Sequence, residues 1–226
     1  MSSKNANITP TRLSRPHLIL CEGRDAERFI GTLLDFFQRE NNEFCNFQII
    51  NFGGIEELNS YLQILPNWSG FRNVKSVTVI RDAERDAQAA VWSVKNAFSR
   101  NGFAVPQAAA LPMRNVTYSS TCIPVDTGFI LFPSCGEKVE NGTLEDLCLS
   151  ILTGEDVESI LAAVDNALKD RQFRQLHKNR LHSYFSMTDK YVSLKIGEAA
   201  KAQAFNFNAA QMKSCKNFLL EMINEK

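Results

Sequence analysis

Three short apolar runs, each ending abruptly before a polar or amphipathic stretch, constrain the fold of this chain more than any other feature. They are Leu18–Cys21, Val77–Ile80 and Gly128–Phe132. A strand that is apolar along its whole length is typical of a parallel sheet with both faces covered, since a sheet with one wet face shows alternation. Another strand is predicted at Phe47–Asn51. The runs therefore predict a mainly parallel, buried sheet.

Amphipathic segments between these runs are predicted to be the helices that cover the sheet. After Gly23, which permits a tight turn, Asp25 is placed to cap a helix with one apolar face. The apolar residues of that helix are Ala26, Phe29, Ile30, Leu33, Leu34 and Phe37. Ile55–Leu65 and the stretch from Ala87 to Phe98 have similar spacing. Strands that alternate with such helices indicate βαβ units, so the predicted class is α/β with a Rossmann-like sheet flanked by helices.

The last third of the chain reads as mostly helical, and Thr143-Leu-Glu-Asp146 has the spacing of a capping box. A peripheral strand is predicted at Asn115–Ile123. The predicted plan is a flexible leader over residues 1–15, an α/β domain over 16–135 and a mostly helical region over 136–226 packed on it. The helices predicted in that region are Asp156–Leu168, Asp170–Phe185, Asp189–Ala204 and Ala209–Asn224.

Composition removes several classes of protein. The 25 basic and 25 acidic residues give no net charge, so affinity for nucleic acid would have to come from a local patch. Six widely spaced cysteines and only three histidines argue against a zinc site and favour reduced, mostly buried thiols. With no apolar run near the ~20 residues that span a bilayer and no signal peptide, we expect a cytoplasmic protein without a membrane partner.

Two of the apolar strands end in acidic residues. Glu22 follows the first, and Asp82 and Glu84 follow the third in chain order. Ligands of open α/β sheets bind outside the carboxyl ends of the strands, so these carboxylates meet at one patch if the two strands are neighbours. Carboxylates that are close together repel one another unless a proton or cation intervenes, and the hard cations Mg²⁺ and Mn²⁺ prefer oxygen ligands. The pattern therefore favours a divalent-metal site.

Each acid also has a purely structural interpretation. Asp82 can be a helix N-cap, and Glu84 can be favoured by the dipole of a first helical turn. Glu22 can accept hydrogen bonds from turn amides, and Asp86 can be a solvated residue. Only the joint occurrence of acids at two strand ends favours the site.

These residues resemble the TOPRIM domain of topoisomerases, primases and OLD-type nucleases, and more closely an uncharacterised OLD-like group of stand-alone TOPRIM proteins. The resemblance rests on Glu22-Gly23 after the first strand and on the Asp82-Ala-Glu84 pair. Three further segments match in the same order, namely Gly128–Pro133, Asn141–Leu147 and the aromatic stretch Phe205–Asn208. The matched part runs from about Pro16 to Leu220.

The resemblance implies roles for these residues. Glu22 would be a general acid/base or metal ligand, with Gly23 as the turn that leaves the site uncrowded. Asp82 and Glu84 would hold Mg²⁺ or Mn²⁺, and Glu145 would be a second-site ligand, or else an acid that merely interacts with the helix dipole. Asp25, Glu27, Asp86 and Asp146 are supporting acids. The chain departs from the family pattern at Glu84, where an aspartate is usual, at Ala26, where an acid is frequent, and at Ser134, where an acid or amide is common.

One basic stretch is placed to bind phosphates. Lys169–His182 contains five Lys or Arg residues, and it is predicted as part of one helix. Side chains at helical spacing would form a stripe that contacts a nucleic-acid backbone in a salt-dependent way. Arg171, Arg174, Lys178 and His182 recur at this spacing, and the predicted nucleic-acid-binding residues are Arg171, Arg174, Lys178 and Arg180. The alternative is a solvated helix face.

Three functions are compatible with these patterns. The first is a Mg²⁺-dependent, nuclease-like enzyme acting on phosphodiesters of DNA or RNA. The second is a non-catalytic TOPRIM-fold module that binds nucleic acid, a protein partner or a second copy of itself. The third is a phosphatase or phosphotransferase for a small molecule, which would suit the absence of a strongly basic surface.

Overall fold

The computed structural model describes residues 12–114 and 123–224. Within these ranges the strands are β1 (His17–Glu22), β2 (Phe47–Gly53), β3 (Ser76–Asp82) and β4 (Asp126–Phe132). All neighbouring pairs are parallel, and the order across the sheet is β2-β1-β3-β4. The predicted α/β class with a parallel sheet is confirmed, and the four strands predicted at Leu18–Cys21, Phe47–Asn51, Val77–Ile80 and Gly128–Phe132 form within a few residues of their expected bounds.

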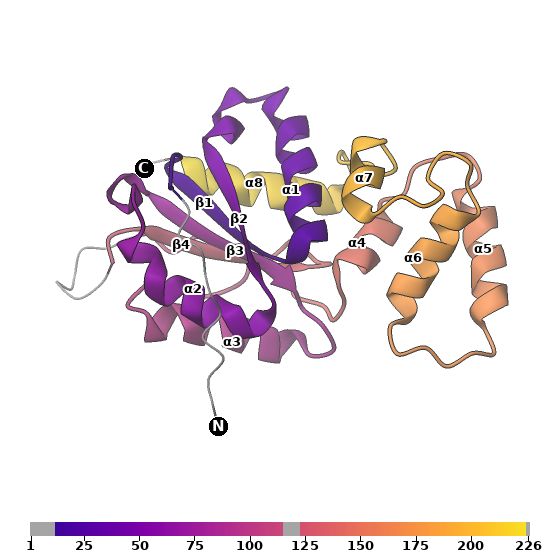
Figure 1. Cartoon of the computed structure of the whole chain (residues 1–226), viewed down its shortest axis with the longest axis horizontal. Coiled ribbons are helices and arrows are strands. Elements are labelled where there is room, and N and C mark those ends of the chain that lie inside the picture. The colour runs from indigo at the N-terminus through magenta and orange to yellow at the C-terminus, as the bar shows by residue number, and fades with distance from the viewer. Residues whose placement is uncertain (1–11, 115–122, 225–226) are drawn as a thin grey trace.

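Helices lie on both faces of this sheet and continue beyond one of its ends (Figure 1). They are α1 (Gly23–Gln38), α2 (Leu58–Ile64), α3 (Ala87–Arg100), α4 (Leu144–Ser150), α5 (Val157–Leu168), α6 (Leu176–Ser186), α7 (Ile196–Lys201) and α8 (Ala210–Ile223). Helices α5 and α6 form a hairpin that projects away from the sheet, with α4 between the hairpin and the strands (Figure 1).

Alternate residues of each strand belong to two different hydrophobic cores, because successive side chains of a strand point to opposite faces. In β1, Leu18 and Leu20 pack with α2 and α3, whereas Ile19 and Cys21 pack with α1 and the C-terminal helices. All four are fully buried. Both faces are thus covered, which is why the strand sequences are apolar without alternation.

The C-terminal helix packs directly on the sheet. Phe218 and Met222 of α8 are buried in the same core as Ile130 of β4. Their approach depends on Gly128, since a Cβ atom added there would lie 2.5 Å from Phe218 Cζ and 3.1 Å from Met222 Sδ. The helical region and the sheet therefore share one core at this face.

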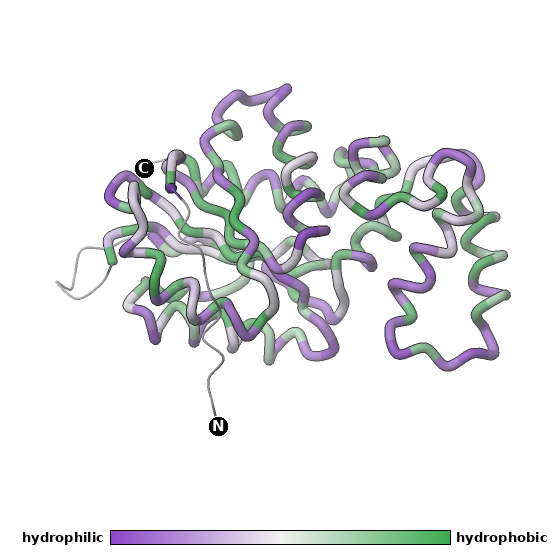
Figure 2. The backbone as a smooth tube through the Cα atoms, viewed as in Figure 1, coloured by the Kyte–Doolittle hydropathy of each residue, from purple (hydrophilic) through white to green (hydrophobic). Residues whose placement is uncertain are grey.

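Several predicted helix bounds are wrong. The predicted helix at Asp170–Phe185 begins only at Leu176, because the preceding polar residues form the connection between α5 and α6, which is hydrophilic in Figure 2. The helix predicted at Asp189–Ala204 shrinks to α7, and Ser193 before it has φ +66°. The segment Ile55–Leu65 is divided into a 3-10 turn, α2, which ends at Ile64, and the start of a second 3-10 turn that contains Pro66, a residue with no N–H to continue the helix.

Two more expectations concern single elements. Asp25 does not cap α1, because the chain passes from β1 into the helix at Gly23 with φ +82°, and Glu22 occupies the cap position. Asp25 instead lies in the first turn. The strand predicted at Asn115–Ile123 lies almost wholly outside the described residues.

Candidate functional site

The topology of the sheet defines where a ligand would bind. From β1 the chain crosses to β2 on one side, and the next crossover returns it to β3 on the other side of β1. The connections therefore diverge between β1 and β3, which is the switch point at which open α/β sheets bind ligands. Glu22 is the last residue of β1 and Asp82 the last of β3, so both predicted acids lie at this point.

Strand register decides how these two side chains point. Cys21 of β1 is level with Ile80 of β3, so the next residue along, Glu22, is level with Arg81. Glu22 and Arg81 consequently share one face, and Arg81 Nε lies 3.5 Å from Glu22 Oε2. Asp82, one residue further, turns toward the opposite face. Sequence reasoning missed Arg81, although alternation along the strand places it on the same face as the buried Val77 and Val79.

Glu22 is largely withdrawn from water. Burial raises the pKa of its carboxyl, the Arg81 guanidinium opposes this, and the charge of Glu84 adds to it. The backbone N–H of Ile55 and the ammonium of Lys178 also lower the pKa. Among the described residues, Glu22 Oε2 and Arg81 Nη1 are buried without a hydrogen-bond partner. Such atoms are costly, and they mark a place where a further group can bind.

Asp82 connects the end of β3 with the start of α4. Its Oδ1 accepts a 2.8 Å hydrogen bond from the Leu144 N–H at the start of α4. Burial raises the pKa of Asp82 to about 7, with additional contributions from the charges of Glu145, Glu22 and Glu84. Asp82 therefore does assist a helix start, but that of α4. The helix directly after it, α3, is capped by Asp86, which accepts from the Ala89 N–H at 2.9 Å.

Two further carboxylates complete what we call the acid cluster, namely Glu22, Asp82, Glu84 and Glu145. Glu84 is exposed with φ +59°, and its backbone exchanges 2.8 and 2.7 Å hydrogen bonds with Gly142. Glu145 on α4 is 7% exposed, and Lys178 Nζ lies 3.6 Å from its Oε1. The fold thus brings together acids that are up to 123 residues apart in the chain, from Glu22 to Glu145.

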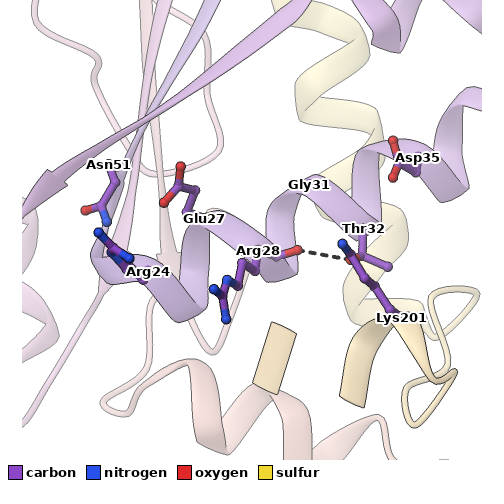
Figure 3. Close-up of a pocket in the computed structure, with 8 residues that line it drawn as sticks. All are labelled: Arg24, Glu27, Arg28, Gly31, Thr32, Asp35, Asn51 and Lys201. Carbon is purple, nitrogen blue, oxygen red and sulfur yellow. Dashed lines mark hydrogen bonds between the residues drawn. The ribbon is translucent and has the colours of Figure 1, made fainter. Parts of the chain in front are cut away.

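The predicted supporting acids have separate positions. Asp146 closes the capping box of α4 by accepting from the N–H and hydroxyl of Thr143 at 2.8 and 3.1 Å. Asp25 is exposed. Burial raises the pKa of the Cys148 thiol, and the charges of Glu145, Asp82 and Asp25 raise it further. Glu27 lines a different hollow, shown in Figure 3.

The basic stretch does not form one stripe. Arg174 and Lys178 border a hollow of about 650 Å³ whose other lining residues include Asp82 and Glu84. Arg180 binds Asp165 of α5 through two contacts of 2.6 and 2.7 Å, so it ties the hairpin together. Arg171 is exposed in the connection before α6 and does not line this hollow. The single-helix interpretation is therefore wrong, since Arg171 and Arg174 precede the helix.

Comparison with protein families identifies the chain. The model of the family described as "Protein of unknown function (DUF3226)" matches residues 16–224, which is nearly the whole sequence. The chain belongs to the DUF3226 family. No curated protein matches it.

Two solved structures resemble this DUF3226 chain. Both are of the C-terminal region of the Xanthomonas campestris pv. campestris OLD protein, one phased with platinum and one with iodine. Their sequence identities are 15% and 14%, and their TM-scores are 0.44 and 0.45. Each comparison covers 92% of this chain, and 94% and 96% of those chains respectively. A likeness of this size carries no argument about activity or ligand.

The acid cluster of the DUF3226 chain fits a hard divalent cation in the chemistry of its donors. All of them are carboxylate oxygens, and one buried oxygen of Glu22 has no hydrogen-bond partner. In the part of the chain that the structure describes, no three metal-binding side chains are grouped closely enough to hold an ion. The donor set fits, and ion binding would require side-chain rotation, with Lys178 leaving Glu145.

Besides Arg81, sequence reasoning missed two further residues of the site, Arg85 and Asn141. Arg85 borders the same hollow as Asp82, and its Nη2 donates to the Arg174 carbonyl at 3.3 Å. Asn141, from the loop before α4, accepts from the Ala87 N–H at 2.9 Å and so fixes the start of α3 beside the cluster. Arg85 stands in no motif that singles it out, and Asn141 was noted only as the first residue of the matched segment Asn141–Leu147. None of the helices within the described ranges is long and apolar enough to cross a membrane.

Substitution of Asp82 by asparagine tests its electrostatic environment, because Asn keeps an oxygen for the Leu144 N–H and removes the charge. The pKa of Asp82 is about 7 in the folded protein against an ordinary 3.8, so the folded state keeps a proton that the unfolded state releases between these values. The wild type consequently loses stability as pH rises through this range. In EDTA, as pH rises from about 5 to about 8, we expect the unfolding free energy of wild type to fall by about 2 kcal/mol relative to that of Asp82→Asn.

Urea unfolding of the two proteins at both pH values measures this gain. Asp189→Asn, which removes an exposed acid outside the hollow, serves as the control for a general charge effect. An identical pH dependence of wild type and Asp82→Asn would contradict the assignment of a raised pKa to this carboxyl.

Proposed function

We propose that this protein is a TOPRIM-type, divalent-metal-dependent phosphoryl-transfer protein that acts on nucleic-acid phosphodiesters in a nuclease-like reaction. One observation carries the proposal. Four carboxylates lie around the switch point of the sheet, and burial, together with the charges of the other three acids, raises the pKa of Asp82 to about 7. A divalent cation at this point would replace the proton and relieve the repulsion.

In this proposal Asp82, Glu84 and Glu145 hold Mg²⁺ or Mn²⁺. The bound ion would supply charge stabilisation at a phosphate oxygen. Glu22 moves the proton of the attacking water or of the leaving group, as a buried carboxyl with a raised pKa is suited to do. Arg81 holds Glu22 in place from the same face of the sheet. Gly23 gives the chain its turn immediately beyond this residue.

Basic groups beside the acids favour a phosphodiester as substrate. The hollow that contains Asp82 and Glu84 is also lined by Arg85, Arg174 and Lys178. Cations and carboxylates that line one hollow suit a ligand in which a metal ion and a phosphate bind together. Lys178, which pairs with Glu145, would be available to contact the phosphate if an ion occupied that carboxylate.

The alternative is a non-catalytic TOPRIM-fold module that binds a nucleic acid or a protein. A specific observation favours it. Arg81 and Lys178 already pair with Glu22 and Glu145, and Asp82 accepts a hydrogen bond from the first N–H of α4, so three of the four acids have structural partners without any ion. In that case the cluster stabilises the junction between the sheet and the helical region, and only its basic border contacts a ligand.

Manganese binding separates these two functions. Free Mn²⁺ is measured by electron paramagnetic resonance during titration into wild type, the double variant Asp82→Asn/Glu84→Gln, and the control Asp189→Asn, whose side chain is exposed and outside the hollow. We expect wild type and control to bind and the double variant to lose at least about tenfold in affinity, as for loss of direct ligands. The same proteins are then incubated with labelled single- and double-stranded DNA and RNA in Mg²⁺ or Mn²⁺.

The outcomes are distinct. Metal-dependent cleavage by wild type and control but not by the double variant supports the enzyme. Cleavage that survives the double substitution overturns the site. No Mn²⁺ binding together with salt-dependent binding of nucleic acid supports the module, and release of phosphate from small esters without cleavage of polymers would assign a small-molecule substrate.

A further inference from the structure

A groove follows the exposed side of α1, away from the acid cluster's own hollow. It consists of two adjoining hollows of about 640 and 610 Å³ that share Thr32, Asp35 and Lys201 in their linings. The first begins beside Arg24 at the start of α1, and Figure 3 shows its lining along this helix, with Lys201 reaching over from α7. The second continues to Arg39 at the end of the helix. We call the two together the α1 groove.

Cations predominate in this groove. Arg24, Arg28, Arg39 and Lys201 line it, and all four are exposed. None of them has an ion-pair partner among the residues that the structure describes. The carboxylates in the lining are those of Glu27 and Asp35, so four cations face two acids on a chain with no net charge. An excess of unpaired cations in a concave surface attracts anions.

Contacts between distant segments hold the residues of this groove beside α1. Gly197 lets α7 approach, because a Cβ atom there would lie 2.3 Å from Arg28 Cβ. This approach places Lys201, 173 residues after Arg28, beside the same helix. At the mouth of the groove, Asn51 Oδ1 accepts from the N–H groups of Gly23 at 3.1 Å and Gly53 at 2.8 Å. The ends of β1 and β2 are thereby fixed next to Arg24.

The far part of the groove has a different chemistry. Phe36 is only partly buried, and the guanidinium of Arg39 lies 5.8 Å from the centre of its ring. Exposed amide side chains of Gln203, Asn206 and Asn208 line the same part. Cations interleaved with an accessible aromatic ring and amides are typical of surfaces that hold unpaired nucleic-acid strands, since bases stack on the ring and phosphates contact the cations.

We propose that the α1 groove binds the backbone of a single-stranded nucleic acid and leads it toward the acid cluster. Arg24 is two residues beyond Glu22, and the helix from Arg24 to Arg39 extends for about 22 Å at about 1.5 Å per residue, which is room for several nucleotides. A duplex is excluded from the aromatic part because its bases stack on one another. The direction toward the cluster rests on the proposed function, whereas the binding itself does not.

Binding without cleavage tests the groove. Fluorescence anisotropy with a labelled oligodeoxythymidylate of about 12 nucleotides is measured in EDTA, so that no metal is present. The groove variant is Arg24→Gln/Arg28→Gln/Lys201→Gln. The matched control is Arg15→Gln/Arg72→Gln/Arg100→Gln, which removes three exposed cations outside both parts of the groove. Thermal melting of both variants verifies that these surface changes leave the fold intact.

We expect the groove variant to bind roughly tenfold or more weakly than wild type, with the slope of log K against log salt reduced in magnitude by about 2, since each phosphate contact on a single strand contributes about 0.7. The control retains both the affinity and most of the slope. Phe36→Leu is expected to weaken single-strand binding by about tenfold without changing the salt slope. Equal losses in groove and control variants, or tighter binding of a duplex than of the single strand, would overturn the proposal.

The inference and the proposed function fail in different ways. If wild type never cleaves in Mg²⁺ but the groove variant still loses single-strand binding, the enzyme is wrong and the groove stands. If wild type cleaves and the groove variant cleaves single strands with unchanged KM, the groove is wrong and the enzyme stands. Repeating the binding assay in a Glu22→Gln/Asp82→Asn background isolates the groove from the acid cluster.

Discussion

Glutamine in place of Glu22 is expected to reduce metal-dependent cleavage by about 10²- to 10⁴-fold, the usual effect of losing a positioned proton-transfer group. The side chain keeps its size and an oxygen for the Ile55 N–H that now stabilises the carboxylate. It loses the ability to exchange a proton. Because Arg81 would then face a neutral partner, thermal melting accompanies the assay, so that a loss of activity is not confused with a loss of fold.

The distinguishing result is the division between chemistry and metal binding. We expect Glu22→Gln to lower kcat while its Mn²⁺ affinity stays within about threefold of wild type, in contrast to Asp82→Asn/Glu84→Gln. Glu158→Gln, an exposed glutamate on α5, is the control for an isosteric substitution elsewhere. Loss of Mn²⁺ binding in Glu22→Gln would make Glu22 a ligand, and full activity in this variant would remove it from the reaction.

Alanine in place of Phe29 is expected to cost about 3–5 kcal/mol of unfolding free energy, the range for truncating a fully buried phenylalanine. The ring lies at the junction of sheet, α1 and C-terminal segment. Its centroid is 6.1 Å from that of Phe132, 5.8 Å from Phe205 and 5.5 Å from Phe207, all in edge-to-face arrangements. Such pairs add to the free energy of burial alone.

Chemical unfolding in urea or guanidinium measures this loss. Phe29→Leu retains most of the apolar volume and is expected to cost less than about 1.5 kcal/mol. Phe36→Ala removes a partly exposed ring from the neighbouring side of α1 and should cost less than Phe29→Ala. A Phe29→Ala protein as stable as Phe36→Ala would show that the three aromatic contacts contribute little to the packing of the C-terminal segment.

A large part of the fold follows from local sequence. The apolar runs in β1, β3 and β4 required cover on two faces, and the helical spacing in α1 and α3 indicated what covers them. Two of these runs were followed by acids, and parallel strands bring such acids to one edge regardless of the details of packing. The fold class and the position of Glu22 and Asp82 at strand ends were therefore accessible without coordinates.

The connection between α5 and α6 shows why other parts were not. Arg171, Arg174 and Lys178 have the spacing of one helical face, and spacing alone cannot reveal that the chain turns among them. The turn is determined by pairing of the two helices, to which the Arg180–Asp165 contact contributes. As a result Arg174 and Lys178 face the acid cluster while Arg180 holds the hairpin.

The sequence by itself determined that this chain forms a parallel α/β sheet with carboxylates at one edge, because apolar strands and helical periodicity are properties of neighbouring residues. Only the tertiary structure decided which groups those carboxylates meet. The pairing of Glu22 with Arg81 depends on register between two strands, the raised pKa of Asp82 depends on burial by α4, and the α1 groove depends on Lys201 returning to Arg28. Each is a contact between distant segments, whose free energy comes from packing that no local pattern encodes.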